Sequence, residues 1–280
     1  MSSKIFTGYD PSFENREELE NSHIDFDFTT FCCAAEVPPT RGIMEKMTRE
    51  DQFSMNSCAG FGLVHAAQVA FYLQTGDFRE FNPHWSYRAG QRVDRRNTDN
   101  GCSIGGVIKG GKTEGLLPQD IENDGTLDFP YPRDQYNFRY PASASEVAAK
   151  RKIGYSAAVP GWEGKLNFLQ AGQGAIVIGG SWGNWAPDAD GICREFRPSP
   201  RGPFHARAYV DWITIGGEVY LVEANSHFKQ YGKKGYAFHN RRFVEAQDRD
   251  TAFVAAGVSD ITLGPGDKPK ERPFRWISLT

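Results

Sequence analysis

The sequence contains no apolar stretch as long as the core of a signal peptide, and none that approaches the length of a membrane span. It opens Met-Ser-Ser-Lys-Ile-Phe and then turns polar and acidic. We therefore expect no membrane partner, and we expect the chain to stay in the compartment in which it is made.

Cysteines are scarce and odd in number, because the chain has five in 280 residues and no C-x-x-C pair. That pattern argues against a disulfide framework and against a zinc site built from thiolates. A cytoplasmic or other reducing compartment is the simpler expectation, and no metal or organic cofactor is implied. The five are Cys32, Cys33, Cys58, Cys102 and Cys193.

A basic excess is also missing, since 32 Lys and Arg stand against 35 Asp and Glu, for a formal net charge of −3. Nucleic-acid-binding proteins usually carry a basic face, so we expect no nucleic-acid partner. Hydrophobic residues make up 39% of the chain and charged residues 24%, as in ordinary globular proteins. The length allows one large domain or two lobes that share an interface.

The first half of the chain shows a helical pattern. Residues 57–73 are rich in Ala, free of Pro and apolar on most faces, which predicts a buried helix. Thr75-Gly76-Asp77 predicts the end of that helix, with the glycine as its C-cap. Three more segments predict helices, namely 83–92, 104–112 and 143–150.

The second half has strand patterns instead. Residues 206–215 and 218–224 flank Gly216-Gly217, which is a strong hairpin signal. Further strands are predicted at 174–179, 235–238 and 252–258. A helical half followed by a β half predicts an α+β chain or two facing lobes. We expect an N-terminal extension over 1–36, a helical lobe over 37–150, a β lobe over 151–258 and a tail over 259–280.

Cys58 stands at the predicted N-terminus of the buried helix. Unpaired backbone N–H groups and the positive end of the helix dipole favour a thiolate there. The alternative is a buried structural cysteine, which is the commoner role of an arbitrary Cys.

A thiolate nucleophile needs a base, and His205 is the best placed of the six histidines. It opens a predicted strand, from which its ring is able to project into a cleft. Across the hairpin, Asn225 falls within a few residues of His205, and its side-chain oxygen is suited to accepting from the imidazole and fixing its tautomer. The alternative for Asn225 is an ordinary turn with Ser226.

These residues resemble the papain-like cysteine peptidase family. Gln52 precedes Cys58 by six positions, as the family's glutamine precedes its nucleophile, and His205-Ala206 resembles the family's His-Ala at a strand start. The segment over 225–236 keeps the spacing of the family's Asn-Ser-Trp-Gly motif without a gap. It also keeps the identities of Asn225, Ser226, Gly232, Gly235 and Tyr236.

The resemblance spans about residues 37–258, from Val37-Pro38-Pro39 through the glycine-rich segment at 101–106 and Tyr131-Pro132. It implies a papain-like two-lobe fold, with a helical N-terminal lobe and an antiparallel β-barrel-like C-terminal lobe. The active-site cleft would lie between the lobes. The implied activity is hydrolysis of a protein or peptide substrate through a Cys-His-Asn triad and an acyl-enzyme, an intermediate that a deamidase or a transpeptidase would share.

The resemblance also assigns roles within that site. Cys58 would attack the peptide carbonyl, and Gln52 with the Cys58 N–H would hold the oxyanion. His205 would protonate the leaving amine, with Asn225 orienting it. The expected substrate-binding residues are Gly105, Gly106 and Trp182, for which turn conformation and core packing are the alternatives.

Three departures from the family motivate a second hypothesis. His227 replaces the family's Trp after Asn-Ser, Ala59 replaces the Trp after the nucleophile, and only about 36 residues stand where the family has a long inhibitory prosegment. Arg207, on the same strand face as His205, would disfavour the imidazolium if it lies close. The alternative is a weak or inactive papain-fold protein whose tails dock onto partner subunits, for instance of a viral or bacterial particle. A tail that covers and regulates the cleft is a further alternative.

Overall fold

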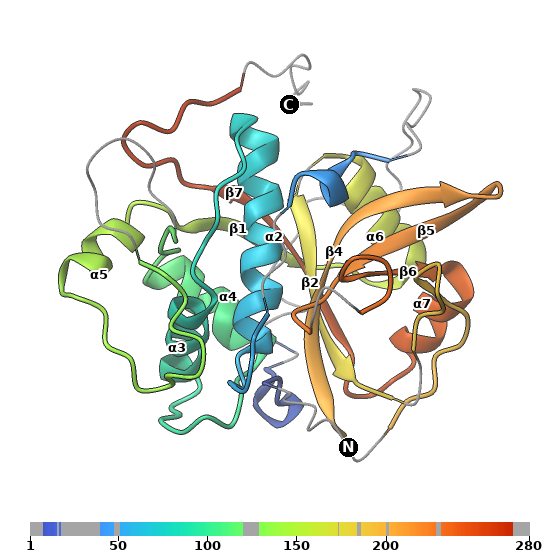
Figure 1. Ribbon diagram of the computed structural model, residues 1–280, viewed down its shortest axis with the longest axis horizontal. Helices are drawn as coiled ribbons and strands as arrows, with labels where there is room; N and C mark the ends of the chain where they lie inside the picture. Colours follow the sequence, from blue (N-terminus) through green and yellow to red (C-terminus); the bar gives the residue numbers. More distant parts are fainter. Residues whose placement is uncertain are drawn as a thin grey trace.

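The computed structural model describes residues 8–15, 17, 40–47, 51–119, 129–172, 174–183, 186–199, 202–227 and 231–270. Cys32, Cys33, Val37-Pro38-Pro39, most of the expected 1–36 extension and the end of the tail lie outside these ranges. The described residues form six α-helices and one seven-stranded sheet. In Figure 1, α2 (Cys58–Thr75) runs through the middle, with α3, α4 and α5 on one side and β2, β4, β5 and β6 on the other.

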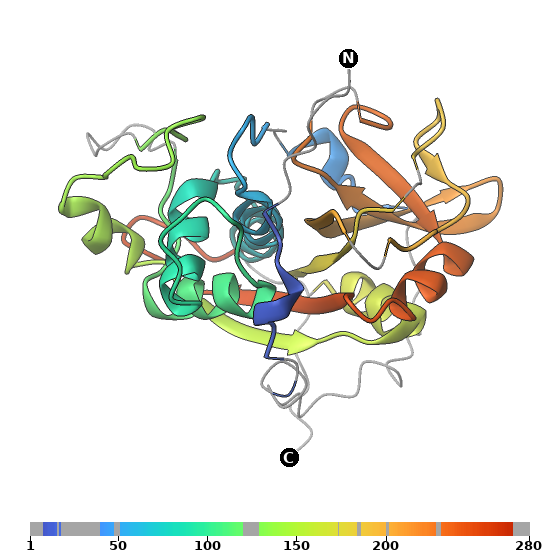
Figure 2. The same ribbon diagram turned by 90° about the horizontal axis from the view of Figure 1, so that it is seen from below.

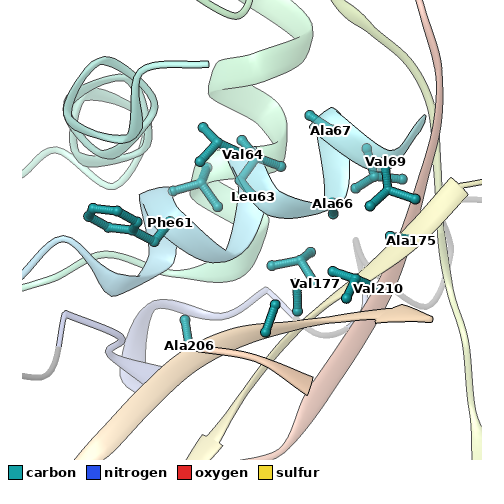
Figure 3. Packing of buried hydrophobic residues seen from close by; sticks show 14 of the residues in the cluster. Phe61, Leu63, Val64, Ala66, Ala67, Val69, Ala175, Val177, Ala206 and Val210 are labelled. Carbon is teal, nitrogen blue, oxygen red and sulfur yellow. The ribbon is translucent and has the colours of Figure 1, made fainter. Parts of the chain in front are cut away.

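Helix α2 is the buried helix that the sequence predicts. Its residues from Cys58 to Phe71 are all buried, which requires small or apolar side chains on every face. Gly76, with φ of 84°, ends it in the left-handed conformation, and its N–H donates to the carbonyl of Tyr72 at 2.7 Å. Figure 3 shows side chains of α2 packed close to those of β2 and β4, among them Val177 and Val210. The helix therefore ties both halves of the chain into one core.

The other predicted helices are α3 (Pro83–Val93), α4 (Ile104–Thr113) and α5 (Ser143–Ala148). Local chemistry sets two of their starts. The Asn82 side chain accepts from the N–H of Trp85 at 3.0 Å, and that of Ser103 accepts from the N–H of Gly106 at 2.8 Å. Both caps fall within one residue of the boundary that the sequence predicts.

The sheet has the strand order β1-β7-β2-β4-β5-β6-β3. Neighbours are antiparallel, except that β3 pairs with β6 in parallel. Its edge strands β1 and β3 do not pair with each other, so in the described residues the sheet is open and the expected barrel-like closure is not reached. The strands are β1 (Ile153–Ala158), β2 (Gly174–Ser181), β3 (Ile192–Cys193), β4 (Phe204–Ile215), β5 (Glu218–Ala224), β6 (Tyr236–Asn240) and β7 (Val254–Ile261).

Two helices and two strands lack a counterpart in the sequence-based expectation. They are α6 (Gly161–Gln170), α7 (Arg241–Asp248), β1 and β3. Helices α6 and α7 contact each other, and α6 also packs against β2 and β4. No helix of the described residues combines the length and the apolar character that crossing a membrane requires.

The hairpin between β4 and β5 brings the second half of the candidate site together. Gly216 and Gly217 both have positive φ, 58° and 84°, which glycine adopts without strain. Ile215 pairs with Glu218, and an irregularity between Tyr209 and Asp211 shifts the register, so Ala208 pairs with Ala224. The start of β4 therefore lies beside the residues that follow β5.

Candidate active site

Cys58 is the first residue of α2 and is fully buried. Its sulfur lies where α2 meets the start of β4, because the N–H of Ala206 donates to Sγ at 3.2 Å. A second backbone donor, the N–H of Gly8, reaches the same atom at 2.8 Å. The sulfur of Cys58 therefore lies against the backbone of the residue that follows His205.

His205 is the second residue of β4, and Asn225 directly follows β5. The distance between His205 Nε2 and Asn225 Oδ1 is 3.1 Å. The N–H of His227 also donates to that Oδ1, at 2.9 Å. Because a carbonyl oxygen only accepts, this geometry puts the His205 proton on Nε2 and the lone pair on Nδ1. In the described part of the chain, His205 Nδ1 is buried without a hydrogen-bond partner.

Aromatic rings enclose His205 on two sides. The ring of His227 stacks on it at 4.4 Å between centroids, with 18° between the planes. Trp182, expected to bind substrate, meets the His205 ring edge to face at 4.6 Å. In this structure Trp182 and His227 therefore shield the His205–Asn225 hydrogen bond, which strengthens it by lowering the local dielectric.

Gln52 is buried beside the same residues. Its Nε2 donates to the carbonyl of Met55 at 3.0 Å, and its Oε1 accepts from the Ser226 hydroxyl at 2.6 Å. The Gln52 N–H donates to the Ser226 carbonyl at 3.0 Å. Ser226 thus fixes Gln52 next to the triad, a role that sequence reasoning missed although Ser226 belongs to the segment that carries the resemblance.

Burial favours the uncharged forms of both the thiol and the imidazole. Burial raises the pKa of Cys58 to about 12, although the N–H groups of Ala206 and Gly8 and the charge of Arg207 oppose the shift. Burial also lowers the pKa of His205 well below its usual value, and the charges of His227 and Arg207 lower it further. The thiolate that the helix N-terminus favours does not form here, because desolvation outweighs those donors.

Residues 8–14, hereafter the strap, cover the sulfur. Figure 2, with α2 seen nearly end-on, shows this dark blue segment passing the end of that helix. The strap pairs with Cys102, whose N–H donates to the Gly8 carbonyl at 2.9 Å and whose carbonyl accepts from the Asp10 N–H at 3.2 Å. Tyr9 is only 4% exposed, and its hydroxyl donates to the Ala252 carbonyl at 3.0 Å.

The strap also occupies one of the two backbone donors expected to meet substrate, that of Gly105. The Glu14 carboxylate accepts from the N–H groups of Ile104 and Gly105 at the start of α4. The N–H of Gly106 donates to the Ser103 hydroxyl, which caps the same helix. Neither glycine therefore offers its N–H to a substrate in this form.

The described residues contain no group of three or more His, Cys, Asp or Glu side chains arranged to hold a metal ion. The groups that the site offers for chemistry are a thiol, an imidazole whose Nδ1 accepts no hydrogen bond from the described residues, an amide that orients the imidazole, and backbone amide donors to the sulfur.

Comparison with known proteins agrees with this fold. Xylellain, a cysteine protease from Xylella fastidiosa, has a TM-score of 0.64 at 17% identity, over 91% of this chain and 96% of that chain. Digestive procathepsin L 3 of Tenebrio molitor larval midgut has a TM-score of 0.62 at 11% identity, over 81% and 72%. Bromelain from Ananas comosus, in complex with the E64 inhibitor, has a TM-score of 0.54 at 12% identity, over 80% and 99%.

No protein-family model matches the sequence, and no curated protein matches it. The fold is therefore similar to that of the papain-like cysteine proteases, as the sequence predicts. A likeness at 11% or 17% identity concerns the fold and not the reaction.

Proposed function

We propose that this protein is a papain-like cysteine peptidase that hydrolyses peptide bonds of a protein or peptide substrate, and that the strap keeps it latent. The observation that supports the proposal is a pair of contacts. Sγ of Cys58 accepts from the N–H of Ala206, the residue after His205, and Nε2 of His205 lies 3.1 Å from Oδ1 of Asn225. A thiol nucleophile, its base and an orienting amide require these residue types close to one another.

The reaction follows from these atoms. The Cys58 thiol proton passes to His205 Nδ1, and the sulfur attacks the carbonyl carbon of the scissile peptide. The carbonyl oxygen becomes an oxyanion that accepts from the Cys58 N–H and from Gln52 Nε2. As the C–N bond breaks, the leaving amine takes the proton from Nδ1. Water then gives a proton to Nδ1 and its oxygen to the acyl carbon, and the C–S bond breaks to return the thiol.

The proposed latency, meaning that the enzyme is inactive while the strap is in place, follows from the contact between the strap and the Cys58 sulfur. A nucleophile needs a carbonyl carbon within reach, and the strap presents the Gly8 N–H instead. The fully buried Cys58 also has no path to a substrate until the strap leaves. Departure of the strap exposes the site to water, which removes the cause of the raised Cys58 pKa and favours the thiolate–imidazolium pair.

The test uses the full chain carrying Gly8→Ala, a change that displaces the strap. We expect hydrolysis of a mixed fluorogenic peptide library by this variant and none by Gly8→Ala/Cys58→Ala. Site-resolved alkylation with limiting iodoacetamide over pH 4 to 9 supplies a second readout. Cys58 in Gly8→Ala should react faster than Cys102 and Cys193, which are buried with raised pKa values. A folded Gly8→Ala protein with no hydrolysis and an ordinary Cys58 thiol overturns the proposal.

A papain-fold protein without catalysis, docked to partner subunits through its tails, is the second candidate. The neutral thiol–imidazole pair beneath the strap favours it, because that pair is inert as it stands. In that case Cys58→Ala is silent and removal of the tails abolishes assembly. A reducing compartment suits either function, since both keep Cys58 as a thiol.

A further inference from the structure

The buried carboxylate of Glu223 lies next to Asn225, on the side of its amide that faces away from His205. Glu223 is near the end of β5, two residues before Asn225, so the two side chains leave the backbone on the same side. Its side chain is completely inaccessible to solvent. An ionised carboxylate in such a place is costly unless several groups compensate its charge.

Four groups surround this carboxylate. Oε1 accepts from Asn225 Nδ2 at 3.1 Å and from the Tyr231 hydroxyl at 3.3 Å. Oε2 lies 3.2 Å from Nη1 of Arg207 and 3.4 Å from Nε2 of His239. The guanidinium of Arg207 is itself fully buried, so the two opposite charges compensate each other and Glu223 is held as the anion.

The contact to Asn225 fixes which way its amide points, together with the N–H of His227, which donates to Oδ1 at 2.9 Å. A side-chain amide has one accepting end and one donating end, whereas a carboxylate only accepts. With Nδ2 on Glu223, Oδ1 must face His205, where it meets Nε2 at 3.1 Å. Reversal of the amide would place two acceptors, Oδ1 and the carboxylate, against each other in a buried site.

We propose that Glu223 is a positioning residue, which fixes the amide of Asn225 and through it the Nε2–H tautomer of His205. This inference rests on the proposed function, because the tautomer matters only if Nδ1 takes the proton of Cys58. Glu223 contacts Asn225, and Asn225 contacts His205, so the route of its effect on the imidazole runs through the Asn225 amide. The anion of Glu223 thereby keeps the Nδ1 lone pair of His205 free for the thiol.

The direct test is the tautomer of His205, read from its imidazole 15N chemical shifts in the full chain. The Nε2–H form is expected in the unmodified protein. Glu223→Gln offers one acceptor oxygen where Glu223 offers two, so Asn225 and Arg207 compete for it. We expect a mixture of tautomers in this variant and a fall of about tenfold in kcat/KM, carried by kcat, in the Gly8→Ala background.

Two controls separate positioning from stability. Tyr209→Phe removes a hydroxyl on the far side of the same network, between His239 Nδ1 at 2.9 Å and Gln247 Oε1 at 2.7 Å. It should lower the melting temperature without moving the His205 tautomer. In an Asn225→Ala background, Glu223→Gln should cost no further activity, because the residue through which it acts is gone.

The outcomes are distinguishable. A folded Glu223→Gln protein that keeps the pure Nε2–H tautomer and full kcat/KM overturns the positioning role and leaves the peptidase proposal intact. A shifted tautomer in a chain that hydrolyses no peptide supports the positioning role while the proposed function fails. Should Glu223→Gln not fold, Arg207→Met/Glu223→Gln removes both buried charges and carries the same NMR test.

Discussion

The N–H of Gly8 donates a hydrogen bond to the sulfur of Cys58 at 2.8 Å, across 50 positions of the chain. This contact places backbone of the strap against the first turn of α2. The fit depends on the absence of a side chain, since a Cβ on Gly8 would lie 1.7 Å from the carbonyl oxygen of Asn56. The atoms that a Cβ on Gly8 would meet are backbone atoms, so no change of a side-chain rotamer can relieve the clash.

Gly8→Ala should therefore displace the strap and expose Cys58. We expect the alkylation rate of Cys58 to rise at least about tenfold at pH 7, because burial no longer raises its pKa. Gly164→Ala is the matched control, since the nearest atom to its new Cβ is 3.7 Å away. Equal Cys58 rates in the two variants would mean that the strap does not close the site.

The Gln52–Ser226 pair gives a prediction on the oxyanion site. Gln52→Ala removes the side-chain amide that the proposed mechanism uses as an oxyanion donor and should lower kcat in the Gly8→Ala background by about 10²-fold or more. Ser226→Ala keeps Gln52 but removes the hydroxyl that holds its Oε1 at 2.6 Å, so a smaller loss of about tenfold is expected. Steady-state kinetics separate the two effects, and Ser145→Ala serves as a serine control on α5. A Ser226→Ala loss confined to KM would contradict the positioning of Gln52.

The sequence predicts the parts of this molecule that local chemistry determines. Helix α2 ends at Gly76 because glycine alone adopts that conformation cheaply, and the two hairpin glycines bring His205 and Asn225 together over a short stretch. The fold and the proximity of His205 to Asn225 were accessible for this reason, with the resemblance supplying the order of the motifs.

Contacts between distant segments were not accessible in the same way. The strap has no periodicity, and its pairing with Cys102 joins positions more than 90 residues apart. Glu223 and Arg207 were harder still, because a charged residue on a strand indicates solvent until its partner is known. Their burial is possible only because the two charges meet at 3.2 Å. Arg207 was expected to disfavour the His205 imidazolium, and its charge does lower the pKa of that ring.

Another ion pair, in which the lysine is buried and the aspartate partly exposed, joins α6 to α7. Lys165 is completely buried, and its Nζ donates to the two carboxylate oxygens of Asp248 at 2.7 and 2.9 Å and to the Gly161 carbonyl at 3.1 Å. Asp248→Ala leaves the ammonium uncompensated and should lower the free energy of unfolding by about 3 kcal/mol at pH 7. Urea denaturation measures this loss, and Lys165→Met/Asp248→Ala should recover most of it.

The Asp248→Ala deficit should also shrink with rising pH. Burial lowers the pKa of Lys165, and without Asp248 the folded state binds that proton still less readily than the unfolded state. The unfolded state then carries the extra proton, so stability rises with pH until Lys165 is neutral in both states. A deficit that stays constant between pH 7 and pH 10 would argue that the pair acts by packing.

His84 makes the stability of the protein sensitive to acid. It is fully buried on α3, with its Nε2 3.0 Å from the Tyr136 carbonyl, and burial lowers its pKa to about 4. Above pH 6.5 the ring is neutral in both the folded and the unfolded state, so its titration does not lower the free energy of unfolding there. As the pH falls below 6.5, His84 becomes protonated in the unfolded chain but stays neutral in the folded chain, so the free energy of unfolding falls toward pH 4.

His84→Gln should remove the part of the acid-dependent loss of stability that His84 causes. For a pKa shift from 6.5 to about 4, the linkage amounts to about 2.5 kcal/mol between pH 7.5 and pH 4.5. The variant should be less stable than the parent at pH 7.5, because a glutamine packs less well, yet lose about 2.5 kcal/mol less on acidification. The measurement is the urea-derived free energy of unfolding at both pH values. His227, whose pKa burial also lowers to about 4, remains in both proteins, so its contribution cancels in the comparison. An identical acid loss in both proteins would show that His84 takes up its proton equally in the folded and unfolded states.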